Sequence, residues 1–308
     1  MSYQIITDSS CDFTKELRES LGISVAPLRL LFRDSELVDT TDDTLKMLYD
    51  GLRNGEAAST SAINPEGWAS YIEPVLEKGE DVLVLAFSSG LSTTYQSAVI
   101  AADELMEKYP GRKVRVVDTL CASLGEGLLV WYACKKQSEG MELDALAAWC
   151  EQVKMNLCHW FTVDDLMYLK RGGRVSAATA VLGTMLSIKP VMHMDDEGHL
   201  VKVSTARGRK ASINALAAKF EALGLEGENE TVFISHGDCL EDAQYLAKVL
   251  QENYGVKEVV IGYVGAVIGS HSGPGTLALF FLGKHREKIR KRACCEKCNT
   301  LCLVLGDV

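Results

Sequence analysis

Two apolar runs with a helical segment between them constrain the fold of this chain more than any other feature. The runs DVLVLAF at 81–87 and KVRVVD at 113–118 are nearly continuous, which is typical of strands buried on both faces of a parallel sheet. The intervening segment at 93–111 has apolar residues at helical spacing and ends in Pro-Gly. A strand, a helix and a strand in this order predict a right-handed βαβ unit.

The pattern changes near residue 158. Two strand-like runs, TVFISHG at 231–237 and EVVIGYVGAVI at 258–268, flank the helical pattern at 240–255. This alternation indicates an α+β arrangement in the second half, whereas the first half indicates α/β with a parallel sheet. We therefore predict a two-domain α/β fold, with an N-terminal domain at 1–158, a C-terminal α+β domain at 159–290 and a cysteine-rich tail at 291–308.

Charge and hydropathy narrow the class of partner. The net charge of −10 over 308 residues argues against nucleic acid or an anionic membrane, because binding phosphate requires clustered Lys and Arg. No run approaches the roughly 20 apolar residues of a spanning helix. The first residues, MSYQIITDSS, lack the basic and apolar regions of a secretory signal. We therefore expect a cytoplasmic protein with no stable membrane insertion.

The ten cysteines fall into two groups. Most are scattered through apolar segments, which predicts buried, reduced thiols. The tail instead crowds Cys294, Cys295, Cys298 and Cys302, and Cys295 and Cys298 form a CxxC. A lone CxxC can ligate zinc or an iron–sulfur cluster, or the thiols can simply pack within a terminal strand. We predict that the functional site of this chain uses neither a metal nor a cofactor.

Familiar enzyme signatures are absent from the sequence. No GxxxxGK[ST] occurs, no GxGxxG follows a strand, and HExxH is missing, so nucleotide or zincin chemistry has little support. The segment GSHSG at 269–273 is close to a nucleophile elbow, but His271 occupies the position of the serine. What remains is a set of hydroxyl side chains, this histidine and a basic KRGGR segment.

The hydroxyl side chains gather where a predicted strand meets a predicted helix. In FSSGLSTTYQSA, Ser92 lies between the strand ending at Phe87 and the helix that follows. Unpaired N–H groups at a helix N-terminus attract anions, so a carboxylate would be stabilised there. A simple helix cap is the alternative for Ser92, and a turn hydroxyl near Pro65 is the alternative for Thr60.

Two further features are candidates for function. His271 lies in a Gly-rich segment, where the chain can approach a ligand closely and imidazole can donate to a carboxylate. Arg171 and Arg174 flank two glycines in KRGGR, which suits an exposed basic turn for a protein partner or phosphate. The alternative there is C-capping by Gly172 with solvated cations.

Seven segments, in order, resemble the successive motifs of the DegV family. That family comprises bacterial fatty-acid-binding proteins, some of which present the fatty acid to a fatty acid kinase. The resemblance covers residues 3 to about 290. The segments are ITDSSCD (6–12), STSAINP (59–65), SSGLSTTYQSA (88–98), VVDT (116–119), DDLMYLKRGGRVS (164–176), SIKPV (187–191) and GSHSGPGTLALFF (269–281).

The resemblance implies a long-chain fatty acid buried between two domains, carried and not transformed. Thr60 and Ser92 would hold the carboxylate, with the Thr93 N–H and His271 beside it. The family usually has glycine at the position of Thr93, so this chain adds a side chain there. Hydroxyl groups suit such a site because they donate to a carboxylate without adding charge. The alternative is a Ser–His acyl hydrolase or acyltransferase that uses Ser92 and His271.

Overall fold

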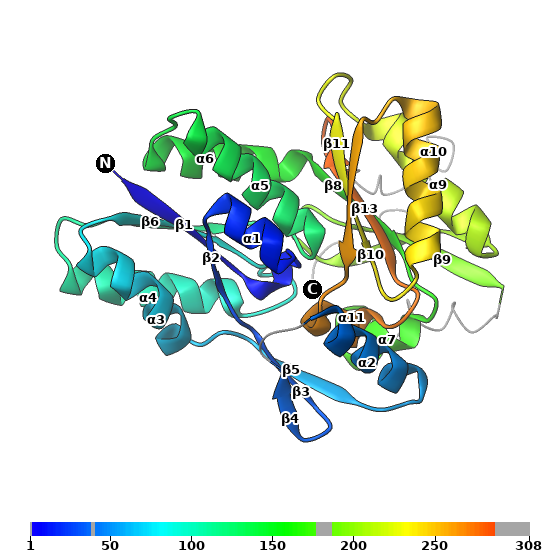
Figure 1. The fold of residues 1–308 in the computed structure, drawn as a ribbon, viewed down its shortest axis with the longest axis horizontal. Helices are drawn as coiled ribbons and strands as arrows, with labels where there is room; N and C mark the ends of the chain where they lie inside the picture. Colours follow the sequence, from blue (N-terminus) through cyan, green and yellow to red (C-terminus); the bar gives the residue numbers. More distant parts are fainter. Residues whose placement is uncertain (1, 38–40, 177–186, 287–308) are drawn as a thin grey trace, which may run out of the picture.

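A four-stranded parallel sheet forms the first lobe of the computed structural model, which describes residues 2–37, 41–176 and 187–286 (Figure 1). Its strand order is β2-β1-β6-β7. The strands are β1 (Tyr3–Asp8), β2 (Ser24–Ala26), β6 (Asp81–Ala86) and β7 (Val114–Asp118). Helix α4 (Thr94–Lys108) connects the parallel neighbours β6 and β7, so the predicted βαβ unit is confirmed.

Helices cover both faces of this sheet, as the continuous apolar strands require. Neighbouring residues of β1 point to opposite sides, so Ile5 joins one apolar cluster and Ile6 the other. Helices α5 and α6 pack on the first face, and α3 and α4 on the second (Figure 1). Their bounds are α3 (Pro65–Glu77), α5 (Leu124–Ser138) and α6 (Leu143–Val153).

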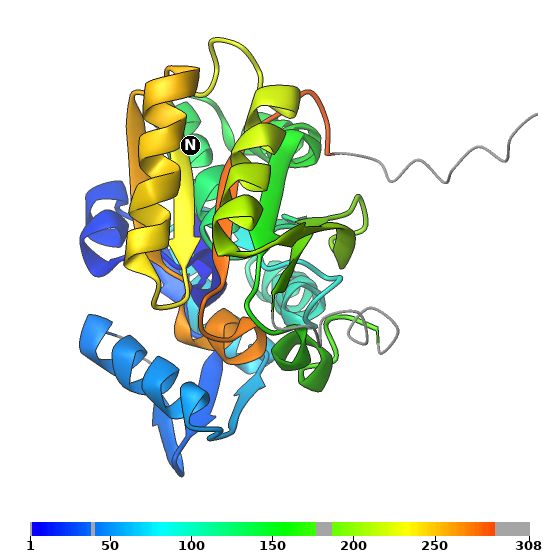
Figure 2. The same ribbon diagram turned by 90° about the vertical axis from the view of Figure 1, so that its right-hand side faces the viewer.

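A six-stranded mixed sheet forms the second lobe, with the order β10-β9-β8-β13-β11-β12. Helices α9 and α10 pack together over one of its faces (Figure 2), and α5 packs on the other. The strands are β8 (Leu157–Thr162), β9 (Ile188–Met194), β10 (Leu200–Arg207), β11 (Thr231–His236), β12 (Glu258–Tyr263) and β13 (Leu277–Leu282), and the helices are α9 (Arg209–Leu223) and α10 (Leu240–Tyr254).

A small antiparallel sheet from the first half of the chain packs on the second half. It has the order β4-β3-β5, with β3 (Arg29–Phe32), β4 (Ser35–Leu37) and β5 (Ala58–Ser61). Helix α2 (Asp42–Arg53) packs with it against α11 (Ala266–Ser272). The sequence analysis did not predict this sheet. The domain boundary at 158 stays a prediction, although β8 begins close to it.

The segment predicted as one strand at 258–268 is a strand followed by a helix. Strand β12 ends at Tyr263, and α11 begins at Ala266, so His271 lies in the last turn of a helix and not in a loop. An apolar run does not distinguish a strand from a buried helix. Helix α11 packs closely against Tyr49 at Gly269, where an added methyl group would clash with the Tyr49 hydroxyl oxygen.

Neighbouring side chains cap several of the remaining short helices. Asp8 accepts a hydrogen bond from Ser10 N and caps η1 (Ser9–Cys11), whereas Thr14 caps α1 (Lys15–Leu21). The other short helices are η2 (Lys154–Asn156) and α7 (Leu166–Arg171).

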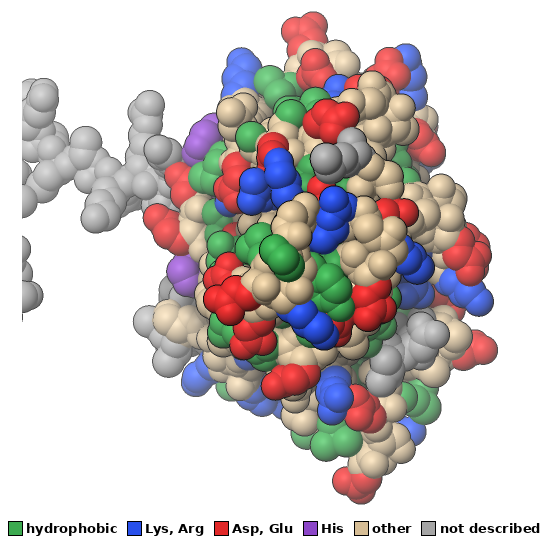
Figure 3. Space-filling view, turned by 90° about the vertical axis from the view of Figure 1, so that its left-hand side faces the viewer, with side chains coloured by type: hydrophobic (Ala, Val, Ile, Leu, Met, Phe, Trp, Pro, Cys, Tyr) green, Lys and Arg blue, Asp and Glu red, His purple; other side chains and the backbone are tan. Residues whose placement is uncertain are grey.

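The described residues have mixed surface charges and reduced cysteines. On the face in Figure 3, acidic and basic side chains alternate and do not gather by sign. All six cysteines in the described ranges are free thiols, and five of them are buried, which confirms the prediction for that part of the chain. The cysteine-rich tail lies outside the described residues. No helix within those ranges is long and apolar enough to cross a bilayer.

Two buried acids meet beneath the carboxyl end of β1. Glu126, in the first turn of α5, accepts hydrogen bonds from Thr7 Oγ1 at 2.9 Å and from Ser10 Oγ at 2.8 Å. Ser10 Oγ also contacts the carboxyl group of Asp8, whose other oxygen accepts from Phe87 N at 2.8 Å. Burial raises the pKa of Asp8 to about 6 and that of Glu126 well above its usual range.

These raised pKa values predict a pH dependence of stability. A carboxyl whose folded pKa is raised contributes stability below its unfolded pKa, near 3.8 for Asp8, and loses it as pH rises through about 6. Glu126→Gln keeps the shape and removes the charge. We expect Glu126→Gln to have a higher Tm than the parent at pH 8, with each kcal/mol gained in the free energy of unfolding raising the Tm by roughly 2–4 °C. We also expect its Tm to fall less than the parent's between pH 5 and pH 8.

Differential scanning calorimetry across this pH range measures both quantities. Glu66→Gln is the matched control, because Glu66 also lies in the first turn of a helix, α3, but is exposed. A Glu126→Gln protein that is less stable than the parent at pH 8 would contradict the prediction.

Candidate functional site

A cavity of about 430 Å³ lies between the two lobes. The loop after β6 and the segment before α5 line it from the first lobe, and β8, β13 and α11 line it from the second. Its apolar wall includes Phe161 and Phe280, which lie on neighbouring antiparallel strands, and Met194 and Leu200, which pair across β9 and β10. Polar side chains also line it, among them Thr60, Ser92 and His271. The cavity is therefore amphipathic.

Thr60 and His271 meet at the cavity wall, although they lie 211 positions apart in sequence. Thr60 is held in β5 opposite Leu30, and its Oγ1 lies 2.8 Å from His271 Nε2. The ring of His271 packs directly on the chain at Gly172, where a methyl group would lie 2.3 Å from Nδ1. Glycine at this position therefore makes room for the imidazole.

His271 is electrically neutral near pH 7. Burial lowers its pKa to about 4, and the nearby Arg174 guanidinium lowers it further in the same direction. A neutral imidazole carries one N–H, so Nε2 can either donate to Thr60 Oγ1 or accept from it. The pair thus offers hydrogen bonds without a positive charge of its own.

Ser92 and Thr93 lie on the cavity wall where α4 begins. Ser92 Oγ lies 2.8 Å from Thr94 Oγ1 and accepts from Thr94 N at 3.3 Å, so it also acts as a helix cap. Thr93 is the N-cap residue of α4, and its side chain makes no capping hydrogen bond. Since Ser92 contacts Thr94 whereas His271 contacts Thr60, the two are not arranged as a Ser–His catalytic pair.

Arg171 and Arg174 are separated by the turn between them. Arg171 is exposed and lies over the Tyr168 ring, with 4.5 Å between its Cζ and the ring centroid. Arg174 is half-buried on the cavity wall and donates from Nε to Leu91 O at 3.2 Å. Gly173, with φ of +72°, reverses the chain between them. The sequence analysis placed both arginines on an exposed turn, whereas only Arg171 lies on the surface.

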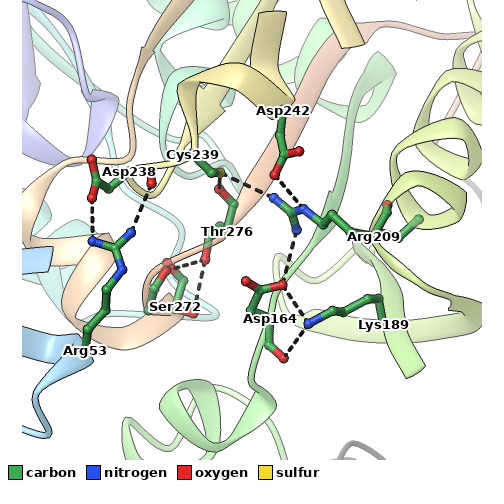
Figure 4. Close-up of polar contacts among 11 residues, drawn as sticks. Arg53, Asp164, Lys189, Arg209, Asp238, Cys239, Asp242, Ser272 and Thr276 are labelled. Atoms are coloured by element: carbon green, nitrogen blue, oxygen red, sulfur yellow. Dashed lines mark hydrogen bonds and ion pairs between the residues drawn. The ribbon is translucent and has the colours of Figure 1, made fainter. Parts of the chain in front are cut away.

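The segment that follows His271 is tied down by polar contacts (Figure 4). Thr276 Oγ1 donates to Gly273 O at 2.8 Å, and Cys239 Sγ donates to Thr276 O at 3.3 Å. Arg209 links this cysteine to Asp242, whose Oδ2 accepts from Arg209 Nε at 2.7 Å. The end of α11 is therefore fixed by the second lobe.

His159 also lines the cavity, where its ring packs against Phe280. Its Nδ1 lies 3.1 Å from Leu157 O, and because a carbonyl can only accept, Nδ1 carries the hydrogen. Burial lowers the pKa of His159 well below its usual range, so this imidazole is neutral near pH 7. The sequence analysis did not identify His159, since a lone histidine in an apolar strand has no distinctive pattern.

No cluster of three or more His, Cys, Asp or Glu side chains suited to a metal occurs in residues 2–37, 41–176 and 187–286. The CxxC motif of the tail lies beyond these ranges. The chemistry available at the cavity is that of hydroxyl groups, backbone N–H groups, two neutral histidines and one guanidinium.

Comparison with known proteins identifies the family. Residues 2–284 match the family model described as "Uncharacterised protein, DegV family". The chain belongs to the DegV family. A DegV domain-containing protein of Clostridium perfringens is 44% identical over 287 residues, which cover 92% of this chain and 99% of that protein.

Solved structures of DegV family proteins have the same fold. One reports fatty acid binding of a DegV family protein from Thermus thermophilus, with 35% identity, a TM-score of 0.82 and coverage of 92% of this chain and 100% of that one. DegV of Bacillus subtilis, described as a fatty acid binding protein, is 28% identical with a TM-score of 0.77, and the match covers 92% of this chain and 100% of that one. The family and the α/β fold class predicted from the sequence are thus confirmed.

The neutral state of His271 is directly measurable. In lipid-free protein, the assigned His271 Hε1 resonance should titrate with a midpoint near 4, because burial disfavours the imidazolium. Arg174→Met removes the guanidinium and should raise that midpoint. NMR titration from pH 3.5 to 8 measures both, with the resonance assigned by its loss in His271→Gln. A His271 midpoint at or above 6.5 would contradict the assignment.

Proposed function

We propose that this chain binds one long-chain fatty acid in the cavity between its lobes and acts as a carrier. The observation that supports this most directly is the amphipathic cavity, which is lined by Thr60, Ser92 and His271 together with many apolar side chains. The relatives described as fatty acid binding proteins support the same ligand. Fatty acids match such a cavity because they join one carboxylate to a long apolar chain.

Hydrogen bonds would hold the carboxylate. If His271 donates from Nε2 to Thr60 Oγ1, the Thr60 hydroxyl hydrogen is free to donate to a carboxylate oxygen. Ser92 O–H and the Thr93 N–H at the start of the 15-residue helix α4 can serve the second oxygen. Arg174, on the same wall, adds the positive charge that His271 lacks.

The apolar wall would supply most of the affinity. At about 0.8 kcal/mol per buried CH₂, fourteen methylenes give on the order of 11 kcal/mol before the costs of association and ordering. The head group then mainly sets the direction in which the ligand lies. Binding of this kind involves no covalent step at the protein, which favours a carrier over an enzyme.

Retention of endogenous lipid tests the carrier function. Protein purified from bacteria should keep near-stoichiometric fatty acid of about 14–18 carbons, because the per-methylene term is large for such chains. Native mass spectrometry with solvent extraction measures this. Thr60→Ala combined with Ser92→Ala should fold normally but exchange lipid faster, because each lost hydrogen-bond partner costs roughly 1–3 kcal/mol.

Two results would contradict the carrier function. One is a parent protein that contains no lipid and takes none from fatty-acid-loaded albumin. The other is turnover of a p-nitrophenyl acyl ester that is lost specifically in Ser92→Ala, which would indicate an acyl hydrolase.

We further propose that the carrier presents its fatty acid to a fatty acid kinase. Arg171 is suited to docking of the kinase, because its side chain is exposed and it is three residues from Arg174, which lines the cavity. Arg171→Ala should therefore slow kinase-dependent phosphorylation of bound fatty acid several-fold and leave lipid affinity unchanged. Arg174→Ala should change both, since its side chain lines the cavity.

Phosphorylation by a bacterial fatty acid kinase, measured with equal lipid loading, tests this docking role. Lys78→Ala is the matched control, because Lys78 is exposed at the end of α3. That position precedes β6, whereas the cavity lies beyond the opposite end of the strand. Equal rates for Arg171→Ala and the parent would rule out docking through Arg171.

A further inference from the structure

The loop at 87–93, between β6 and α4, carries Ser92 and Thr93 and is called here the head-group loop. Its own lobe holds its first half. Phe87 N donates to Asp8 Oδ2 at 2.8 Å, Ser88 N to Cys121 O at 3.1 Å, and Ser89 N to Asp118 Oδ1 at 3.1 Å. These contacts anchor the loop to the parallel sheet but do not relate it to the second lobe.

The tip of the hairpin between β9 and β10 touches this loop from the second lobe. Ser88 is fully buried, and its Oγ donates to Gly198 O at 2.9 Å and accepts from Gly90 N at 3.2 Å. Gly90 packs on the same peptide, since a methyl group there would lie 2.7 Å from the carbonyl oxygens of both Glu197 and Gly198. The loop and the hairpin therefore meet backbone to backbone.

The tip itself is well ordered by internal hydrogen bonds. Asp195 Oδ1 accepts from His199 N at 2.8 Å and from Glu197 N at 3.1 Å, and Gly198 takes φ of +76°. The hairpin is also part of the cavity wall, because Met194 and Leu200, the pair next to its tip, line the cavity. One rigid element thus touches both the head-group loop and the space for the acyl chain.

Binding of one carboxylate by all of the proposed head-group residues requires two parts of the molecule to be correctly placed relative to each other. Thr60 and His271 lie on the small sheet and α11, whereas Ser92 and Thr93 belong to the first lobe. We propose that the tip of the β9–β10 hairpin positions the head-group loop, through Ser88 and Gly90, so that both parts bind the same carboxylate. This inference rests on the proposed fatty acid binding. Ser88, Gly90 and Gly198 act as positioning residues and need not touch the ligand.

Gly90→Ala tests the proposal, because the Gly90 backbone lies outside the left-handed region and the atoms nearest to an added methyl group belong to the hairpin. The readout compares a 16-carbon fatty acid with the 16-carbon alcohol, which has the same chain length but no carboxylate. Gly90→Ala should weaken the acid about tenfold or more, as expected for loss of a charge-assisted hydrogen bond, and the alcohol by less than about threefold. Glu197→Ala is the control, since it trims an exposed side chain and keeps the carbonyl that Gly90 contacts.

Displacement of a fluorescent fatty acid analogue from lipid-free protein gives both affinities. A folded Gly90→Ala protein that keeps the parent's acid-to-alcohol ratio would overturn the proposal. If Gly90→Ala does not fold, Ser88→Ala takes its place and should lower the ratio about threefold to tenfold, and an unchanged ratio would again overturn the proposal. A parent that binds neither compound would instead refute fatty acid binding itself.

Discussion

Burial of α5 between the two sheets is the constraint on which the rest of the structure depends. The helix packs on the parallel sheet through one side and on β8, β11 and β13 through the other, so it is apolar nearly all round. Its start brings Ser123 to the cavity wall and Glu126 beneath β1. One helix thus contacts both sheets, and the cavity lies at its N-terminal end.

The same burial determines which chemistry the cavity can offer. Water is largely excluded, so His159 and His271 are held neutral, and the pKa of Asp12, whose carboxyl contacts Ser123, rises to about 7 mainly through burial. Arg174 is the cation on this wall within the residues that the structure describes. An anionic ligand would therefore meet uncharged donors backed by one guanidinium, an arrangement suited to holding a carboxylate without reacting with it.

How much of this follows from sequence depends on the range of the interactions. The βαβ unit was predictable, because continuous apolar strands and a helical period are local signals. The small sheet was not, because β3 and β4 have only four and three residues and are stabilised by packing on α11. The direction of Arg174 was also hidden, since it depends on the turn at Gly173. The proximity of Thr60 and His271 has no local signal at all, and only resemblance to a family indicated it.

The pairing of Thr60 with His271 has a consequence for synthesis of the chain. The two residues are 211 positions apart, and α11 also covers the apolar side of the small sheet. A chain emerging from the ribosome therefore cannot complete either contact until almost all of it has been made. Residues such as Leu30 and Leu48 stay uncovered by α11 during that interval. The cavity wall that Thr60 and His271 share is thus completed only after α11 has been made.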